Sequence, residues 1–450
     1  MSATLRPSLT SDATPGAASA DRVRRALAAL ESAREHTLAI IAPLSDADAA
    51  TQHDLLMSPI IWDLGHIAAF ENLWLLHNTN GPIEFSEMPG TYDPFAHPRA
   101  TRGALALPTL DEARAELARV RDEVRRRLAD TSFGASSPLL RDAYVVRMVA
   151  QHESQHQETI LQTLQLKRGA PYAAPRAWDT PRGAMIADEG AMVRCAGGRV
   201  TIGTDDRSES YDNERPRHEI ELAPFWIDVT PVTNGAFLRF VEGGGYDEPS
   251  LWSEAGWAWR NESGVRAPKH WEYGAAGWST RSMDRVAPLD PLRPVCHVCY
   301  HEAEAYARFV EKRLPTEQEW EVAATWDPAA NRSRAYPWGD ERPTAELANV
   351  DQLSFQTAQI GAYERNVSPI GCYGMIGDVW EWTSTDFAGY PGYETFPYPE
   401  YSELFFGSDY KVLRGGSWAT SADVARATFR NWDYPIRRQI FSGFRCARDA

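Results

Sequence analysis

The sequence predicts a two-part fold, α followed by α+β, in which a four-helix bundle precedes a domain of short strands and frequent turns. Over residues 21–168, apolar side chains recur at three- and four-residue spacing, the period of amphipathic helices. Beyond that stretch the period shortens to two in places, and glycine, tryptophan and proline become frequent, as in a loop-rich β domain. The 450 residues also exceed what one hydrophobic core usually fills.

These changes in texture set the expected domain boundaries. We expect a disordered tail over residues 1–20, the bundle over residues 21–170, a linker over residues 171–190 and the second domain over residues 191–450. Ser58 has the residue type of an N-cap, and Gly169 is typical of a helix end. The four predicted helices of the bundle cover residues 21–44, 59–77, 110–128 and 139–168.

The second domain gives clear local signals at three places. The alternating segment HEIEL at residues 218–222 predicts a strand. Helices are predicted over residues 301–312 and 316–324, and the second opens on a capping box formed by Thr316 and Glu319. This half therefore has the pattern of an α+β domain with much irregular structure.

Composition excludes several classes of partner. The formal net charge of −16 argues against nucleic acid and against an anionic membrane surface, because both need a basic footprint. No apolar run approaches the roughly 20 residues that span a bilayer. The first 20 residues lack the apolar core of a secretion signal, so we expect a cytoplasmic protein. The five cysteines are few and odd in number, which favours reduced thiols, and the one CxxC pair, Cys296 and Cys299, is weak evidence for zinc.

Three histidines indicate a metal site. His152 and His156 stand four residues apart on the fourth predicted helix, which places both rings on one face, one turn apart. His66 lies on the second predicted helix, and neighbouring bundle helices can bring the three rings to a shared ion.

A carboxylate ligand fits this pattern less well. Glu153 and Glu158 project away from the face that His152 and His156 share, so helix geometry favours three imidazoles. Asp63, three residues before His66, has the position of a residue that orients that imidazole. Imidazole ligands alone leave iron and zinc open.

The second half carries a set of short motifs that resemble, as an ensemble, the formylglycine-generating-enzyme domain, a variant of the C-type-lectin fold. The motifs are DNERPRH (212–218), FWIDVTPVTN (225–234), KRLPTEQEW (312–320), YPWG (336–339), GMIGDVWEW (374–382), RGGSW (414–418) and GFR (443–445). The chain departs from that family where its cysteine pair would stand, because residues 431–438 hold no cysteine and Cys446 is single. Thiol chemistry of that type is therefore not expected here.

The first half resembles a DinB-type bundle, a family that places three histidine ligands on its helices. The pairing of the two domains resembles the sulfoxide synthases of ergothioneine biosynthesis. Residues 92–102 (YDPFAHPRATR) and 430–437 (RNWDYPIR) are similar to segments of the actinobacterial-type branch of that family.

This resemblance implies an Fe(II)- and O2-dependent enzyme, with Fe(II) on His66, His152 and His156. The implied reaction joins the sulfur of γ-glutamylcysteine to C2 of the hercynine imidazole and oxygenates it, giving γ-glutamyl-hercynylcysteine sulfoxide. Hercynine is trimethylated histidine. The second domain's family also implies a structural Ca2+, for which the sequence offers no specific ligand set. We expect the protein to act as a monomer on small molecules alone.

The resemblance also implies substrate contacts. Arg99, Arg102 and Arg437 are expected to clamp the carboxylates of the sulfur donor, for which the guanidinium fork is suited. Asp433 is expected to bind the ammonium group of the donor.

For the acceptor, Trp432 offers an aromatic face to the trimethylammonium group, and Asn431 and Gln155 are expected to hydrogen-bond it. A tyrosine is expected to donate a proton to the activated oxygen. Spacing favours Tyr393, with Tyr390 and Tyr398 as alternatives.

Other functions stay open on the sequence alone. The same chemistry could use cysteine as donor or histidine as acceptor, as in ovothiol synthesis. A zinc-dependent thiol transferase of the DinB type would use the same three histidines without O2. A non-catalytic binding module on the lectin-like fold is a further alternative, although a pure binder needs no open metal site.

Overall fold

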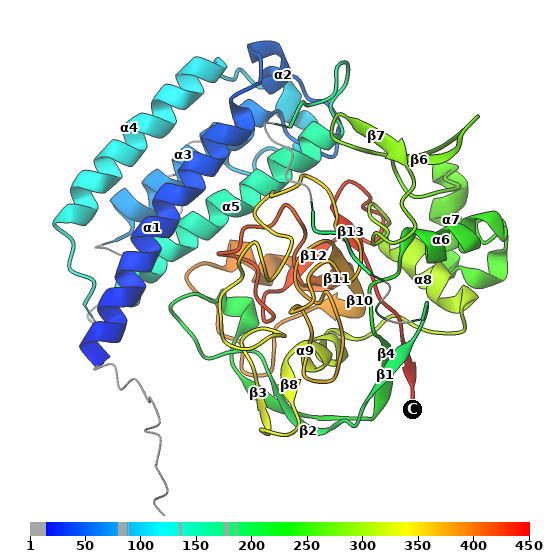
Figure 1. The fold of residues 1–450 in the computed structure, drawn as a ribbon. Coiled ribbons are helices and arrows are strands. Elements are labelled where there is room, and N and C mark those ends of the chain that lie inside the picture. The colour runs from blue at the N-terminus through cyan, green and yellow to red at the C-terminus, as the bar shows by residue number, and fades with distance from the viewer. Residues whose placement is uncertain are drawn as a thin grey trace, which may run out of the picture.

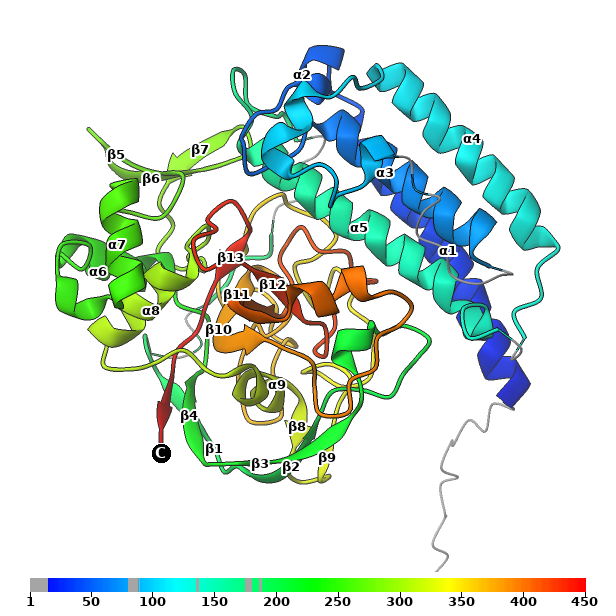
Figure 2. The same ribbon diagram turned by 180° about the vertical axis from the view of Figure 1, so that it is seen from behind.

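The computed structural model describes residues 15–79, 88, 90–134, 137–174, 180–184, 186 and 188–450. Long helices form one part of the molecule and short strands with small helices form the other (Figure 1). Helix α5 (Tyr144–Gln165) lies between the two parts in both views (Figure 2). The predicted order of a helical bundle followed by an α+β domain is confirmed.

The helical part has the four long helices that the periodicity predicts. They are α1 (Pro15–Ile41), α3 (Ile60–Asn72), α4 (Leu110–Ala129) and α5, with a short α2 (Asp46–Ala50) between the first two. A π-helical turn, η1 (Leu73–His77), extends α3 to the end of the predicted helix. Helix α4 begins at a capping box in which Thr109 accepts a hydrogen bond from the Glu112 amide.

Three details of the prediction are wrong. Helix α1 begins at Pro15, so the last six residues of the predicted tail are helical; residues 1–14 lie outside the described residues. Proline suits a helix start and the alanines after it favour helix.

Ser58 does not cap α3, because its hydroxyl accepts a hydrogen bond from Arg102 instead. Helix α5 begins five residues late, since Asp142 and Ala143 adopt positive φ angles and turn the chain just before it.

The second part is built around two small sheets. The four-stranded sheet has the order β12 (Asn431–Asp433), β11 (Gly407–Arg414), β10 (Trp380–Phe387), β13 (Ser442–Gly443). Strand β11 is antiparallel to both of its neighbours, and β13 is parallel to β10. The three-stranded sheet joins the first and last strands of the domain through β4, in the order β1 (Met192–Cys195), β4 (Phe225–Asp228), β14 (Ala447–Asp449).

Hairpins and small helices complete this part. The predicted strand at residues 218–222 is β3 (His218–Leu222), which pairs with β2 (Gly198–Ile202), and the Thr316 capping box opens α9 (Glu317–Thr325) as predicted. The other elements are α6 (Asn234–Glu242), α7 (Glu254–Ser263), α8 (Tyr300–Phe309), the sheet β5 (Trp271–Gly274), β6 (Gly277–Ser282), β7 (Arg285–Pro288), and the pair β8 (Trp326–Asp327), β9 (Arg332–Ser333). Across the described ranges, no helix is both long and apolar enough to cross a membrane.

Polar side chains of α5 attach the bundle to the second part. The buried carboxylate of Glu158 accepts hydrogen bonds from Trp380 Nε1 (2.7 Å), Ser417 Oγ (3.0 Å) and Thr420 Oγ1 (2.8 Å). Burial raises the pKa of Glu158, although these three donors act in the opposite direction. Gln165, two turns further along, accepts from the Met283 amide and donates to the Arg281 carbonyl. One face of α5 therefore belongs to the interface between the two parts.

Candidate metal centre

The structure brings the three predicted ligands together between α3 and α5. The ligand nitrogens of His66, His152 and His156 lie within 4.8 Å of one another, and the two Nε2 atoms of His66 and His152 are 3.2 Å apart. Within the described part of the chain, this is the one group of three or more histidine, cysteine or acidic side chains close enough to share an ion.

Hydrogen bonds at Nδ1 turn two of these rings toward the centre. His66 Nδ1 lies 2.8 Å from the Tyr92 carbonyl, so this nitrogen carries the proton and leaves Nε2 free as a ligand. His156 Nδ1 lies 3.1 Å from Oδ1 of Asp63, which is buried. Asp63 therefore orients His156 and not His66, because one turn of α3 separates Asp63 from His66 and aims its carboxylate at α5.

Burial and aromatic walls keep the imidazoles of His66 and His152 neutral and fixed. Burial, followed by the neighbouring His156, holds the pKa of His66 and of His152 well below the ordinary value. Trp62 stacks on His66, with ring centroids 5.0 Å apart, and Phe70 stacks on His152 at 3.6 Å. Neutral imidazole is the form that binds metal, so the residues present fit a first-row divalent ion with open coordination positions.

Two tyrosines of the second part hold Gln155, which lies between the ligands on α5. Gln155 Nε2 donates to the Tyr401 hydroxyl at 3.0 Å, and its Oε1 accepts from the Tyr211 hydroxyl at 2.9 Å. The two tyrosine rings stack at 4.1 Å. Neither tyrosine is among the residues predicted from the sequence, although Tyr401 stands only three residues after Tyr398.

Strand β12 carries Asn431, Trp432 and Asp433, the substrate-contact residues predicted in the second part, and contacts Tyr401 through Trp432. The Trp432 ring stacks on Phe387 at 4.1 Å and meets Tyr401 edge-on at 5.6 Å, so Tyr401 links Trp432 to Gln155. Asn431 precedes Trp432 on the strand and pairs with Leu413 of β11. Its Oδ1 accepts a hydrogen bond from the Trp432 amide.

Charged residues gather next to Trp432. Asp433 Oδ1 lies 3.4 Å from Arg437 Nε, and burial raises the pKa of Asp433 while Arg437 and then Arg99 lower it. Arg99 is half-buried and makes a 3.4 Å hydrogen bond to the Leu56 carbonyl. These three groups, one from the bundle half and two from the second half, form a charged rim.

Arg102 has a different environment from Arg99. It is 5% exposed, and its guanidinium lies 3.5 Å above the Trp62 ring that stacks on His66. It donates to the His97 carbonyl at 2.8 Å, the Ser58 hydroxyl at 2.8 Å and the Pro94 carbonyl at 3.3 Å. Burial lowers its pKa to about 10. In this arrangement Arg102 supports the loop that presents Arg99, and a direct substrate contact stays a prediction.

The three loop tyrosines occupy separate places. Tyr398 lies 6.2 Å from Phe70 between ring centroids, and Phe70 in turn covers His152. Tyr393 donates its hydroxyl to Asp212 at 2.8 Å. Tyr390 packs under the Arg430 guanidinium at 4.1 Å, within the second part. Tyr398 is thus the one of the three that reaches the aromatic wall of the centre.

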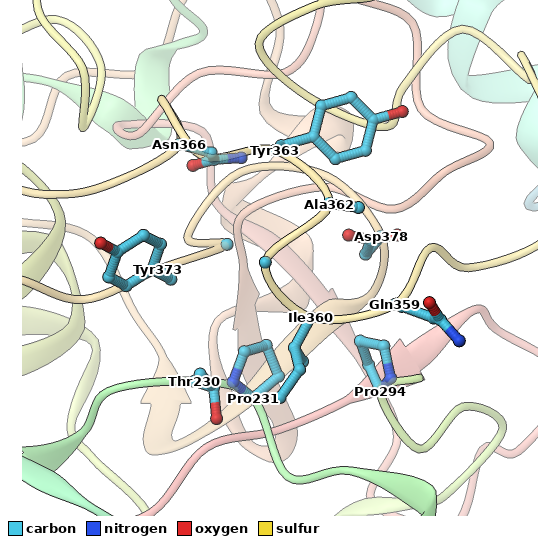
Figure 3. Close-up of a pocket in the computed structure, with 12 residues that line it drawn as sticks. Thr230, Pro231, Pro294, Gln359, Ile360, Ala362, Tyr363, Asn366, Tyr373 and Asp378 are labelled. Carbon is cyan, nitrogen blue, oxygen red and sulfur yellow. The ribbon is translucent and has the colours of Figure 1, made fainter. Parts of the chain in front are cut away.

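The cavity drawn in Figure 3 is separate from this centre. It is lined by residues of the second part, including Thr230, Asn366 and Asp378, and by none of the predicted site residues. The hydroxyl groups of Tyr363 and Tyr373 point outward on opposite sides of the group (Figure 3).

Comparison with known proteins follows the division seen in the fold. Residues 29–160 match the family model of the DinB superfamily, and residues 180–450 match that of the sulfatase-modifying factor enzyme 1-like domain. The fold and the three-histidine group thus define a class, a DinB-like metal-binding bundle joined to a domain like that of formylglycine-generating enzymes. The fold class inferred from the sequence motifs is confirmed.

Full-length relatives narrow this class. A hercynine oxygenase of Mycolicibacterium thermoresistibile is 44% identical over 427 residues, which is 93% of each chain. A hercynine oxygenase of Mycobacterium tuberculosis is 43% identical over 426 residues, covering 93% of this chain and 97% of the relative. The chain belongs to the hercynine oxygenase family, and the resemblance noted in the sequence is confirmed. Among solved structures, that of PvdO from Pseudomonas aeruginosa aligns with a TM-score of 0.40 and 22% identity, over 58% of this chain and 94% of the other.

Proposed function

We propose that this protein joins the sulfur of γ-glutamylcysteine to C2 of the hercynine imidazole and oxygenates that sulfur. The balanced reaction takes one thiol, one imidazole C–H and one O2 to a sulfoxide and one water. One oxygen atom enters the sulfoxide, and the other leaves as water with the protons of the thiol and of C2. The observation that carries the proposal is the three-histidine group of the bundle, beside which Gln155 of α5 bonds to Tyr401 of the second part. Tyr401 in turn contacts Trp432.

Fe(II) is the ion that we propose for His66, His152 and His156. Iron bound there would activate O2 and hold the thiolate. Zinc could hold a thiolate, but it has no redox chemistry and could not activate O2. The protein contributes three neutral ligands and leaves the remaining coordination positions to the reactants.

The charged rim gives the sulfur donor its place. γ-Glutamylcysteine carries two carboxylates and one ammonium group. We assign the carboxylates to Arg99 and Arg437, with Arg102 behind them, and the ammonium group to Asp433. Cysteine lacks the γ-glutamyl carboxylate, so it would leave part of this rim unpaired.

The acceptor site lies between β12 and α5. We assign the trimethylammonium group to the aromatic surface around Trp432, whose ring stacks on Phe387 and contacts Tyr401 and Phe405. We assign hydrogen bonds to the acceptor to Asn431 and Gln155, whose side-chain amide is held in position by Tyr211 and Tyr401.

We propose that a loop tyrosine delivers the proton. Tyr393 was the choice from spacing, but its hydroxyl donates to Asp212, whereas Tyr398 reaches the wall formed by Phe70. Burial raises the pKa of Tyr398 well above its ordinary value, so its hydroxyl is protonated at neutral pH and is a donor. Tyr398 is therefore the first of the two to test.

All the residues assigned to this reaction belong to one chain, so we expect an active monomer. The deciding experiment incubates Fe(II)-loaded protein aerobically with hercynine and either γ-glutamylcysteine or cysteine, and measures the products by mass. A hercynine conjugate with one added oxygen, formed chiefly from γ-glutamylcysteine, supports the reaction and the donor together. The same product chiefly from cysteine would overturn the donor assignment, and conversion of histidine in place of hercynine would overturn the acceptor.

A further inference from the structure

Four buried charged side chains form a closed ring in the core of the bundle, each from a different helix. Arg34 comes from α1, Glu71 from α3, Arg121 from α4 and Glu153 from α5, and we call them the bundle ring. Arg34 donates to Glu71 Oε2 at 2.6 Å and to Glu153 Oε1 at 2.8 Å. Arg121 donates to Glu71 Oε1 at 2.6 Å and to Glu153 Oε2 at 3.2 Å. Each arginine therefore bridges the same two carboxylates.

Further hydrogen bonds complete the bundle ring. Arg34 Nη1 donates to the Leu117 carbonyl and Arg121 Nη1 to the Leu30 carbonyl, both at 2.7 Å. Thr37 Oγ1 donates to Glu153 Oε1 at 2.8 Å. The ring residues are 6% exposed or less, and both carboxylates are at 1% or below. All four carboxylate oxygens thus have partners in an environment that excludes water.

A buried ring of this kind is a poor source of net stability. Removing four charges from water costs about as much as their attraction returns, and apolar residues of similar size often stabilise a core as well. Bidentate arginine–carboxylate pairs instead constrain geometry. They form only when the helices that carry them keep one spacing and one rotation. The role of the bundle ring therefore depends on which functional residues its four helices carry.

The two carboxylates sit on the two helices that carry the metal ligands. Glu153 follows His152 directly, and Glu71 stands five residues after His66. Helices α1 and α4 supply no ligand of the three-histidine group, but they supply both arginines. The arginines therefore tie α3 to α5 beside the point where the Nε2 atoms of His66 and His152 approach to 3.2 Å.

We infer that the bundle ring is a positioning device for the metal centre. It fixes the spacing and rotation of α3 against α5, so that the three imidazoles converge before an ion binds. The inference rests on the metal site of the proposed function and concerns its assembly, not the reaction. It assigns α1 and α4 a functional part, although neither contacts the ion.

The test replaces the arginine forks and keeps their charge. Arg34→Lys and Arg121→Lys each retain a cation but lose the bidentate geometry. Arg119→Lys is the matched control, since Arg119 pairs with Glu116 through two hydrogen bonds on the exposed side of α4. Val124→Ala controls for general destabilisation, because Val124 is fully buried on α4 and makes no ion pair. Co(II) is the probe, and its dissociation constant, its visible spectrum and the melting temperature of the metal-free protein are measured.

We expect Arg34→Lys and Arg121→Lys to weaken Co(II) binding by about tenfold and to alter its visible bands, while both controls keep the wild-type dissociation constant. A variant with Arg34→Met, Glu71→Leu, Arg121→Met and Glu153→Leu should melt near the wild-type temperature and still bind Co(II) weakly. Wild-type Co(II) affinity and spectrum in the two lysine variants would overturn the inference, whether or not the fourfold variant folds. If the wild-type protein binds Co(II) but makes no sulfoxide, the proposed function fails and the positioning role stands.

Discussion

Each of the two parts of the molecule contains a buried cluster of two arginines and two glutamates, but the two clusters draw their residues from different kinds of element. The bundle ring takes one residue from each of four helices. In the second part, Glu317 and Glu321 lie on α9, Arg414 ends β11 and Arg430 directly precedes β12, all at 2% exposure or less. Arg430 binds Glu317 through two hydrogen bonds of 2.8 Å, and Arg414 contacts Glu317 at 3.1 Å. We call this set the β-domain cluster.

The difference shows which geometry each part has to hold. The bundle ring fixes helix against helix, which sets the metal ligands. The β-domain cluster fixes the chain that leads into Asn431, Trp432 and Asp433, which are the residues proposed to contact the substrates. Damage to the first should thus appear in metal binding and damage to the second in substrate binding.

The largest expected effect comes from the ligands themselves. His152→Ala should remove one of three imidazoles and, with it, measurable iron binding and at least about 10³-fold in sulfoxide formation. His66→Ala and His156→Ala should behave alike. Metal content and product mass measure the change. Full activity of His152→Ala would contradict the assignment of the site, while an unchanged near-ultraviolet circular dichroism spectrum would show that the second part remains folded.

The next largest effect is expected from substitution of the loop tyrosines. Tyr398→Phe removes only the hydroxyl group, and we expect the sulfoxide-forming rate to fall about 10²-fold, with more O2 spent on oxidising the thiol. Single-turnover rates and the ratio of sulfoxide to oxidised thiol measure this. Tyr393→Phe is the matched comparison. If Tyr393→Phe gives the larger loss, the role returns to the tyrosine that the spacing favoured.

Arg430→Lys tests the comparison between the two charge clusters directly. It keeps the cation beside Glu317 but loses the two-pronged contact that precedes β12. We expect KM for either substrate to rise about tenfold while the Co(II) dissociation constant stays at the wild-type value. Arg121→Lys should show the reverse pattern. Equal loss of metal affinity in both variants would mean that the two clusters have no separate tasks.

The smallest expected effect comes from a substitution in the charged rim. Arg99→Ala should raise KM for γ-glutamylcysteine by about five- to tenfold, the size of one charge-assisted contact in partly exposed surroundings. KM for cysteine as a poor donor should change less, because it has one carboxylate fewer. Steady-state kinetics with both thiols gives the two numbers. Equal changes would show that Arg99 does not read the γ-glutamyl group.

Local signals in the sequence predict much of the bundle half. Helix periodicity and the four-residue spacing of His152 and His156 depend on neighbours along the chain, so both could be inferred without the fold. The pairing of Asp63 with His156 could not, because it depends on how two helices rotate against each other. The late start of α5 was also hidden, since Ala143 is a residue type that seldom takes positive φ.

In the second half the short motifs predicted the domain, but not the neighbours of the site. Trp432 could be placed near the centre from its resemblance to the family. Tyr211 and Tyr401 lie 190 residues apart and meet at Gln155 only after the whole domain has folded. Such contacts between distant loops leave no periodic trace in the sequence.

The docking face of α5 limits how this enzyme can be recombined. The helix contributes two ligands on one face and, through Gln155 and Glu158, carries the anchor points of the other domain on the adjoining face. A chimera that takes its second domain from a relative, joined at the linker, would pair this face of α5 with a surface to which it is not matched. Domain exchange should therefore succeed only when the residues of α5 that contact the second domain are exchanged together with that domain. The exchangeable unit of this fold thus extends beyond the domain boundary into α5.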